Sequence, residues 1–236
     1  MTQTGISAKD IEALRRFDTC TLSNAIERFN IRPRNEGFML DGPACMFRGL
    51  PPTAGYAATA KMRAASQPVS GHCYYDDIEW WRYLASVPPP RMVVVLDADD
   101  PPGVGALFGE LHAHICRAME CVAYVTNGAV RDLPEIERLG FQLFAHKLSP
   151  SHAYAHIVEF GEPVEIGGLT IQSGDLLHAD LHGVQTVPLE IAAQLPAVAA
   201  EVLAEERALI KMCLDGKFSI ERLAATIRQF TEAQKC

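Results

Sequence analysis

Three short runs decide the fold: MVVVL (92–96), CVAYV (121–125) and FQLF (141–144). The first is fully apolar and rich in β-branched residues, which is typical of a strand that is buried on both faces. The second is predicted to be another buried strand, and the third a further strand. The segments between them, 105–119 and 133–138, have the pattern of helices, so strands and helices alternate along this part of the chain. This order predicts an α/β core with parallel strands.

The segments outside this core show two different sequence patterns. Between His156 and Pro188, stretches of four to six residues alternate in polarity and are separated by glycines, which predicts an antiparallel meander packed on the first sheet. Residues 189–214 and 218–232 are rich in Ala and Glu and are predicted to be helical. We therefore expect one α/β domain, N-terminal helices included, over residues 1–188, and a helical appendage over residues 189–236.

Composition narrows the classes of function. The net charge of −8 argues against nucleic-acid binding, which requires a basic surface. No run approaches 18 consecutive apolar residues, so no membrane association is expected. The first residues lack the pattern of a secretory signal, and the seven cysteines are scattered without a C-x-x-C pair. A cytoplasmic protein with reduced thiols is the expectation.

The stretch PGVGALFGELHAHICRAMECVAYVTNGAVRD (102–132) carries the most chemical information. Ligands bind beyond the carboxyl ends of parallel strands, and the loops after the first two apolar runs lie at that edge. If those strands are neighbours, Glu110, Arg131 and Asp132 converge. Carboxylates suit Mg²⁺ or Mn²⁺, and a guanidinium can bind a carboxylate or a developing enolate. An ordinary surface pair at a turn is the more common explanation for an Arg-Asp dipeptide taken alone.

Three segments, in the same order, resemble the RraA-like family, which includes the 4-hydroxy-4-methyl-2-oxoglutarate aldolases. They are FDTCTLSNAIE (17–27), the spacing G-E-x(20)-R-D that ends in NGAVRD (127–132), and GEPVEIGGLTIQSGDLLHADLHGVQTVP (161–188). The resemblance spans most of the chain and implies a layered β/β/α domain of the swivelling type. Two positions depart from the family pattern, because Asn24 and Asn127 stand where Asp is more common.

The resemblance also implies roles for individual residues. Asp132 would ligate the divalent metal ion, Mg²⁺ or Mn²⁺, and Arg131 would contact the keto or enolate oxygen of the substrate. Glu110 matches an acidic position that holds, and helps to deprotonate, a metal-bound water. The backbone amides expected near the substrate carboxylate are those of Gly109, Leu111 and His112.

The family forms homotrimers, sometimes paired into hexamers, with sites at the subunit boundaries. In the aldolases, an acid on the C-terminal helix of a neighbouring subunit also reaches the metal-bound water. Glu205 or Glu206 is the matching residue here, so the appendage is expected to pack on a neighbouring subunit.

The function implied is a divalent-metal-dependent lyase that cleaves a 4-hydroxy-2-oxo acid to pyruvate by a retro-aldol reaction. Decarboxylation of oxaloacetate passes through the same enolate and is expected at the same site. The alternative is a non-catalytic, regulatory member of the family that binds and restrains a ribonuclease-associated machine. The long extension after Pro188 favours the enzyme, because the regulatory form is shorter.

Other patterns carry less weight. His178, Asp180 and His182 alternate in a predicted strand and share one face, but in the family this stretch is structural. His152 and His156 have helical spacing within a predicted loop, and we interpret them as core or surface histidines. The GVGALFGE segment lacks the Gly-Lys-Ser/Thr of a phosphate-binding loop, so nucleotide binding is not expected.

Overall fold

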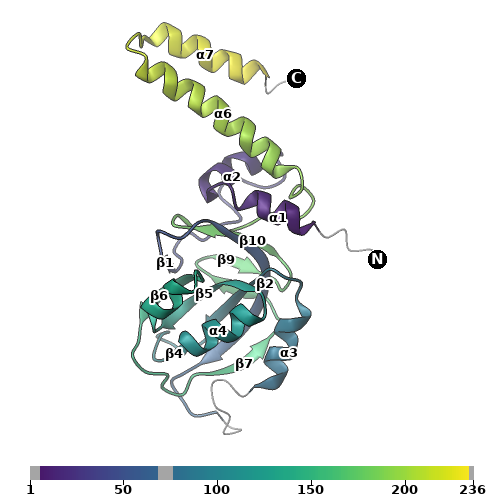
Figure 1. Ribbon diagram of the computed structural model, residues 1–236, viewed down its shortest axis with the longest axis vertical. Helices are drawn as coiled ribbons and strands as arrows, with labels where there is room; N and C mark the ends of the chain where they lie inside the picture. The colour runs from purple at the N-terminus through teal and green to yellow at the C-terminus, as the bar shows by residue number, and fades with distance from the viewer. Residues whose placement is uncertain (1–5, 69–76, 234–236) are drawn as a thin grey trace.

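A large mixed sheet forms the centre of the molecule (Figure 1). The computed structural model describes residues 6–68 and 77–233. Its strands are β1 (Ala44–Cys45), β2 (Thr53–Arg63), β3 (Arg91–Asp97), β4 (Ala106–Phe108), β5 (Cys121–Val130), β6 (Gln142–Leu148), β7 (His156–Phe160), β8 (Val164–Ile166), β9 (Leu169–Ile171), β10 (Leu176–Asp180) and β11 (Gly183–Thr186). Its helices are α1 (Ala8–Leu14), α2 (Thr19–Glu27), α3 (Ile78–Ser86), α4 (Glu110–Ala118), α5 (Leu133–Arg138), α6 (Leu195–Leu214) and α7 (Ile220–Ala233).

The main sheet has the strand order β1-β6-β5-β3-β2-β10-β11, with β4 also paired to β5 and β7 also paired to β2. The pairs β2–β3, β3–β5, β5–β6 and β4–β5 are parallel, so the predicted parallel core is confirmed. The strands after His156 are antiparallel to their partners. They are divided between the main sheet and a separate hairpin of β8 and β9. Together these elements make the α/β fold expected from the sequence.

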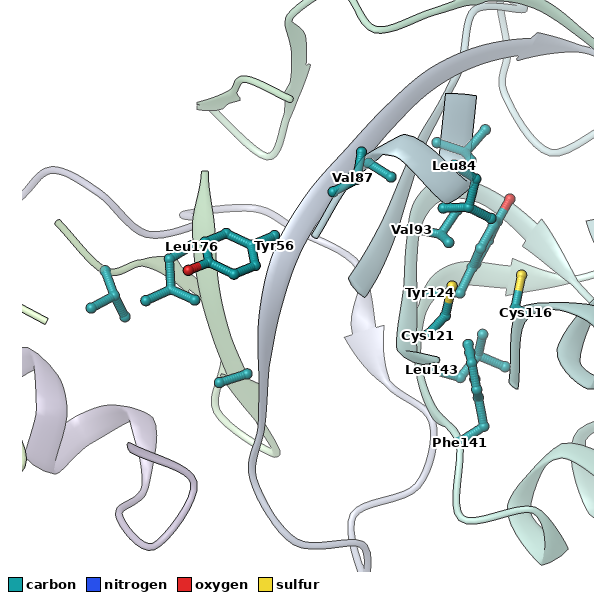
Figure 2. Close-up of a cluster of buried hydrophobic side chains, with 14 of the residues drawn as sticks. Tyr56, Leu84, Val87, Val93, Cys116, Cys121, Tyr124, Phe141, Leu143 and Leu176 are labelled. Atoms are coloured by element: carbon teal, nitrogen blue, oxygen red, sulfur yellow. The ribbon is translucent and has the colours of Figure 1, made fainter. Parts of the chain in front are cut away.

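Side chains on the two faces of the sheet form two separate cores. On one face, helices α3, α4 and α5 contribute to a large cluster, in which Figure 2 shows Cys116 of α4 close to Tyr124 and Cys121 of β5. On the other face, the β8–β9 hairpin covers β3 and β5 through Val164, Ile166 and other apolar residues. The molecule is therefore layered, with the helices and the hairpin on opposite sides of one sheet.

Local signals explain where the first helices begin. Ser7 and Asp10 form a capping box at α1, each side chain accepting from the other residue's backbone N–H. Asp18 accepts from the Thr21 N–H at the start of α2, and Asp77 does the same for Trp80 at the start of α3. Helix α3 therefore begins at Ile78.

One prediction within the core was wrong. The segment 105–119 was expected to be a single helix, but residues 106–108 form β4 and the helix begins only at Glu110. The run ALF is apolar throughout, and its three residues are too few to distinguish a strand from a helical turn by periodicity. This short strand is decisive for the site described below.

The C-terminal helices extend from the sheet on the side of α1 and α2 (Figure 1). Helix α6 packs against α2 at its N-terminal half, and Ala199 and Val202 are buried there. Within the described chain, no helix combines the length and the apolar character needed to cross a membrane.

His178 of β10 gives the fold a predictable dependence on pH. Burial lowers the pKa of this ring to about 4, against smaller opposite effects of the Asp180 charge and of backbone groups at Leu14 and Phe17. An unfolded histidine binds a proton near pH 6.5, so between pH 6.5 and 4 the unfolded state binds more protons than the folded state. The contribution of His178 to the free energy of unfolding is therefore expected to fall by about 3 kcal/mol across this window as the pH decreases.

Urea unfolding at pH 7 and at pH 4.5 checks this expectation. His178→Gln is expected to show a much smaller loss of stability between the two pH values than the wild-type protein. His146→Gln is the matched control, because His146 is exposed. An equal loss in the wild type and in His178→Gln would contradict the assignment.

Candidate functional site

The centre of the site is formed where β4 and β5 end side by side. The two strands are parallel, with Ala106 opposite Ala129 and Phe108 opposite Val130. The Arg131 amide donates to the Phe108 carbonyl at 3.1 Å, which continues the pairing by one more bond. Because both strands stop at the same level, the residues that follow them are brought together.

Glu110, Arg131 and Asp132 meet at this edge, as the sequence predicted. The backbone N–H of Glu110 donates to Asp132 Oδ2 at 3.0 Å. Arg131 Nε lies 3.3 Å from both carboxylate oxygens of Asp132. The convergence has a different origin from the one expected: the partner strand that carries Gly109 and Glu110 is β4, and not the strand over 92–96.

Backbone conformation sets the direction of the Asp132 carboxylate. Asp132 has φ +56° and ψ +40°, in the left-handed region that Asp and Asn occupy more readily than most residues. This turn ends β5 and points the carboxylate towards the start of α4. Gly109 completes the arrangement, because a Cβ there would lie 2.6 Å from Asp132 Oδ2 and 2.9 Å from Arg131 Cγ. Only glycine allows this close approach without moving the pair.

Charges at the site are accessible to a ligand. The side chains of Arg131 and Asp132 are 29% and 32% exposed, and that of Glu110 is 53% exposed. An ion pair this exposed contributes at most about 1 kcal/mol to stability, so its groups are available for other interactions. The positive end of the α4 dipole adds to the attraction for anions at this edge.

The first turn of α4 supplies the backbone amides. Amides in the first turn of a helix have no acceptor within the helix, and that of Glu110 is bonded to Asp132. Leu111 is 49% exposed beside it, whereas the His112 side chain is buried, with its ring 5.6 Å from Trp81 and 6.2 Å from Phe108. The family resemblance implies that the backbone amide of His112 lies near the substrate, and the structure places the His112 ring in the core.

The oxygen donors at this edge suit a metal ion that keeps most of its water. Asp132 and Glu110 provide carboxylates, and Asp132 retains acceptor capacity beyond its bonds to Glu110 and Arg131. Among the described residues, no group of three or more His, Cys, Asp and Glu side chains is placed to hold a metal. One or two carboxylates are the usual protein contribution to Mg²⁺, which retains several waters. The donor set therefore fits Mg²⁺ or Mn²⁺ better than a metal that needs a closed cage.

The Asn127 side chain links β5 to β3 by two hydrogen bonds to the backbone of Asp97, just before the site. Its Oδ1 accepts from the Asp97 N–H at 2.7 Å, and its Nδ2 donates to the Asp97 carbonyl at 3.0 Å. Beyond this point β5 changes partner from β3 to β4. Asp97 is itself buried, and burial raises the pKa of its carboxyl although the amides of Gly103 and Asp99 donate to it. An amide side chain is needed at 127 because it must both donate and accept.

Asn127→Asp is therefore expected to destabilise the protein by about 2 kcal/mol, since the Asp97 carbonyl loses its donor and faces a carboxylate instead. The midpoint of urea unfolding measures the effect. Asn35→Asp, at an exposed loop position, serves as the control and is expected to change the midpoint little. An unchanged midpoint for Asn127→Asp would show that the two bonds are not important.

The two acids expected from the C-terminal region lie elsewhere in the chain. Glu205 forms a two-bond ion pair with Arg28, with distances of 3.1 and 2.6 Å. Glu206 accepts a hydrogen bond from Asn24 Nδ2 at 3.1 Å. Asn24 is one of the two asparagines at positions where the family more often has Asp. Figure 1 shows α6 beside α1 and α2, at the opposite end of the molecule from β4. Within one chain, neither acid joins the Arg131–Asp132 pair.

The alternating residues of β10 are engaged in structural contacts. His178 is buried, as described above, and Asp180 accepts from the Thr19 hydroxyl and amide and from the His182 amide. Burial acts to raise the pKa of Asp180, but these hydrogen bonds outweigh it, and the pKa lies below its usual value. The Asp180 carboxylate therefore holds the start of α2 against β10.

Sequence reasoning missed His152 as a neighbour of the site. Its Nε2 lies 3.0 Å from Arg131 Nη1, and its Nδ1 lies 3.1 Å from the Ala106 carbonyl. His152 belongs to the irregular segment between β6 and β7, and it is 21 positions from Arg131. Spacing along the sequence carries no signal for such a contact.

Comparison with known proteins gives a consistent family assignment. The family described as Aldolase/RraA (RraA-like) matches residues 19–185. Protein DlpA of Legionella pneumophila is 25% identical over 185 residues, which are 78% of this chain but only 26% of DlpA. The chain thus corresponds to about a quarter of that relative's length. A protein of Halorhodospira halophila named "Putative 4-hydroxy-4-methyl-2-oxoglutarate aldolase" is 29% identical over 64% of this chain and 91% of its own.

Solved structures show the same fold. An uncharacterized protein from Pseudomonas syringae superposes with a TM-score of 0.72 at 24% identity, over 96% of this chain and 97% of its own. RraAS2 of Streptomyces coelicolor, described as an unusual member of the RNase ES inhibitor RraA protein family, gives a TM-score of 0.66 at 22% identity, over 86% and 96% of the two chains. The family match covers most of the chain, and the segments that carry the site lie within it. The chain belongs to the RraA-like family.

Proposed function

We propose that this protein is a divalent-metal-dependent lyase that cleaves a 4-hydroxy-2-oxo acid, similar to 4-hydroxy-4-methyl-2-oxoglutarate, to pyruvate. The observation that carries the proposal is the convergence of a guanidinium, a carboxylate and the N-terminus of α4 at one accessible edge. A 2-oxo acid has a carboxylate and a carbonyl oxygen on adjacent carbons, and these groups match the anion-binding helix end and the Arg131 fork. The aldolase name of the Halorhodospira relative points to the same reaction class.

The chain's own residues account for binding and proton transfer. The first-turn amides of α4 bind the substrate carboxylate. Arg131 donates to the 2-oxo oxygen, and this bond strengthens as the oxygen gains negative charge. Glu110 accepts the proton of the 4-hydroxyl, directly or through a water, because its carboxylate is exposed at the same edge.

Deprotonation of the 4-hydroxyl starts the cleavage of the carbon–carbon bond. As the hydroxyl loses its proton, the bond between carbons 3 and 4 breaks and the distal fragment leaves as a carbonyl compound. The electron pair of that bond forms the enolate of pyruvate, which Arg131 stabilises until carbon 3 is protonated. A Mg²⁺ or Mn²⁺ ion held at Asp132 would add Lewis-acid polarisation of the 2-oxo group. Decarboxylation of oxaloacetate forms the same enolate and is proposed as a second reaction.

A neighbouring copy of the chain is part of the proposal. Glu110, Arg131 and Asp132 are partly exposed, while Glu205 and Glu206 belong to α6, which lies at the other end of the molecule from β4 (Figure 1). A homotrimer or hexamer would bring the acid of one copy to the edge formed by the next. Glu206 is the more exposed of the two acids, whereas Glu205 is committed to Arg28.

Pyruvate release from a panel of 4-hydroxy-2-oxo acids and oxaloacetate tests the proposal. Turnover is expected with Mg²⁺ or Mn²⁺, and its loss is expected with EDTA. The Arg131→Ala protein, assayed in parallel, controls for contaminating activity and for spontaneous decarboxylation. A folded protein that releases no pyruvate from any of these substrates would contradict the proposal and favour the regulatory role.

A further inference from the structure

We propose that His152 is a positioning residue that holds the Arg131 guanidinium in the orientation needed to receive the substrate oxygen. The inference rests on the proposed function, and it adds a residue that does not itself touch the substrate. Its basis is the 3.0 Å contact between His152 Nε2 and Arg131 Nη1. This contact uses a different nitrogen of the guanidinium from the Nε group that faces Asp132.

Two contacts of the ring indicate which of its nitrogens carries the proton. The Ala106 carbonyl can only accept a hydrogen bond, so His152 Nδ1, at 3.1 Å from it, must carry the proton. A guanidinium can only donate, so Nε2 must present its lone pair to Arg131. Both bonds are satisfied together only by the neutral ring with the proton on Nδ1. His152 is therefore an acceptor for Arg131 and not a second cation beside it.

The backbone around His152 is held firmly against β4. The Ala106 N–H donates to the Ser151 carbonyl at 2.9 Å, and the Ala155 N–H donates to the His152 carbonyl at 3.0 Å. Gly105 allows this close approach, because a Cβ there would lie 2.1 Å from the His152 oxygen. Ala153 adopts φ +48°, a conformation that costs a residue with a side chain about 1 kcal/mol or more. This unfavourable backbone conformation occurs in the residue next to His152, whose ring contacts Arg131.

These contacts define which part of Arg131 remains for a ligand. Nε faces the Asp132 carboxylate and Nη1 donates to His152. Nη2 makes no hydrogen bond to any residue that the structure describes, so it and the second Nη1 hydrogen are the donors left for the substrate. Two fixed contacts on a planar group determine its plane, and orientation of a donor to within about 1 Å can change a rate about 10²-fold.

Two substitutions of His152 each keep one of its hydrogen bonds and remove the other, so the bond to Arg131 can be tested apart from the bond to Ala106. In His152→Gln, the amide oxygen reaches the place of Nε2 and can still accept from Arg131. In His152→Asn, the amide nitrogen reaches the place of Nδ1 and can still donate to Ala106, but the acceptor for Arg131 is lost. His156→Asn is the matched control, since His156 Nδ1 also contacts a carbonyl, that of Tyr154, at 2.7 Å.

The kinetic test is pyruvate release by the metal-loaded protein. His152→Asn is expected to lower kcat by about 10- to 100-fold with little change in KM, because the orientation matters most when charge develops on the oxygen. His152→Gln is expected to retain most of the kcat, and His156→Asn all of it. Equal kcat values for His152→Asn and the wild type would overturn the inference, as would equal losses for the Asn and Gln variants.

Crystal structures of the same variants provide a readout that does not depend on activity. The Arg131 guanidinium is expected to leave its position in His152→Asn and to keep it in His152→Gln. An unmoved guanidinium in His152→Asn overturns the positioning role even if the protein is an active lyase. If the wild-type protein releases no pyruvate, the proposed function fails, while the position of Arg131 in these structures still decides the claim about His152.

Discussion

Replacing Asp132 with asparagine is expected to lower kcat/KM for pyruvate release by about 10²- to 10³-fold while leaving the fold intact. Several kcal/mol of transition-state stabilisation depend on a carboxylate that holds the metal ion, and about 1.4 kcal/mol corresponds to a tenfold change in rate. Asparagine tolerates the left-handed conformation that Asp132 adopts at φ +56°, and its oxygen can still accept from the Glu110 N–H. The substitution therefore removes the charge and keeps the shape.

The expected loss of stability in Asp132→Asn is only about 1 kcal/mol, from the exposed pair with Arg131 and the interaction with the α4 dipole. Initial rates and thermal unfolding of the same preparation separate the two effects. Glu135→Gln is a suitable control, because it removes a carboxylate from α5 outside the site. Wild-type turnover by Asp132→Asn, with an unchanged metal requirement, would exclude Asp132 as the metal ligand.

Arg131→Ala is expected to reduce kcat/KM by about 10³-fold, since the developing enolate loses its main protein donor. Arg131→Lys keeps the charge but loses the planar fork that bonds Asp132 and His152 at once, so we expect a loss of about 10- to 100-fold. Steady-state kinetics on a substrate turned over by the wild type measures both. Full turnover by Arg131→Ala on every 2-oxo acid tested would remove the basis of the proposed mechanism.

Arg131→Ala also tests whether sites are shared between copies. The partner variant carries Glu205→Gln and Glu206→Gln, and each variant alone is expected to be nearly inactive. The two proteins are mixed in equal amounts and their subunits are allowed to exchange. About a quarter of the subunit interfaces would then combine Arg131 from one subunit with Glu205 and Glu206 from its neighbour. Activity should then recover in that proportion. No recovery despite demonstrated exchange would place each complete site within one chain.

Much of the fold could be predicted from the sequence because its buried strands are long enough to show a pattern. The runs 92–96 and 121–125 are apolar and β-branched, and they became the parallel neighbours β3 and β5. The three residues of β4 show no such pattern, and their pairing with the second half of β5 depends on a change of partner at residues 127–128. That change follows from tertiary packing, which periodicity does not report.

The candidate site was predicted in part for the same reason. The position of Glu110 relative to Arg131 and Asp132, together with the family resemblance, led us to expect that these residues converge, and the structure brings them together. The left-handed turn at Asp132 and the contact from His152 had no counterpart in the sequence pattern. A histidine in an irregular segment most often has a structural explanation, and only the geometry distinguished His152 from His156.

The short strand β4 has a consequence for the order in which the molecule folds. The cluster of Glu110, Arg131, Asp132 and His152 comes from one stretch of 43 consecutive residues, whereas β2 must find β10 more than 100 positions away. Contacts of low sequence separation form with a smaller loss of chain entropy. The site can therefore assemble early, before the long-range pairing closes the sheet. Amide protons of β4 and β5 should accordingly become protected from exchange during refolding before those of β10.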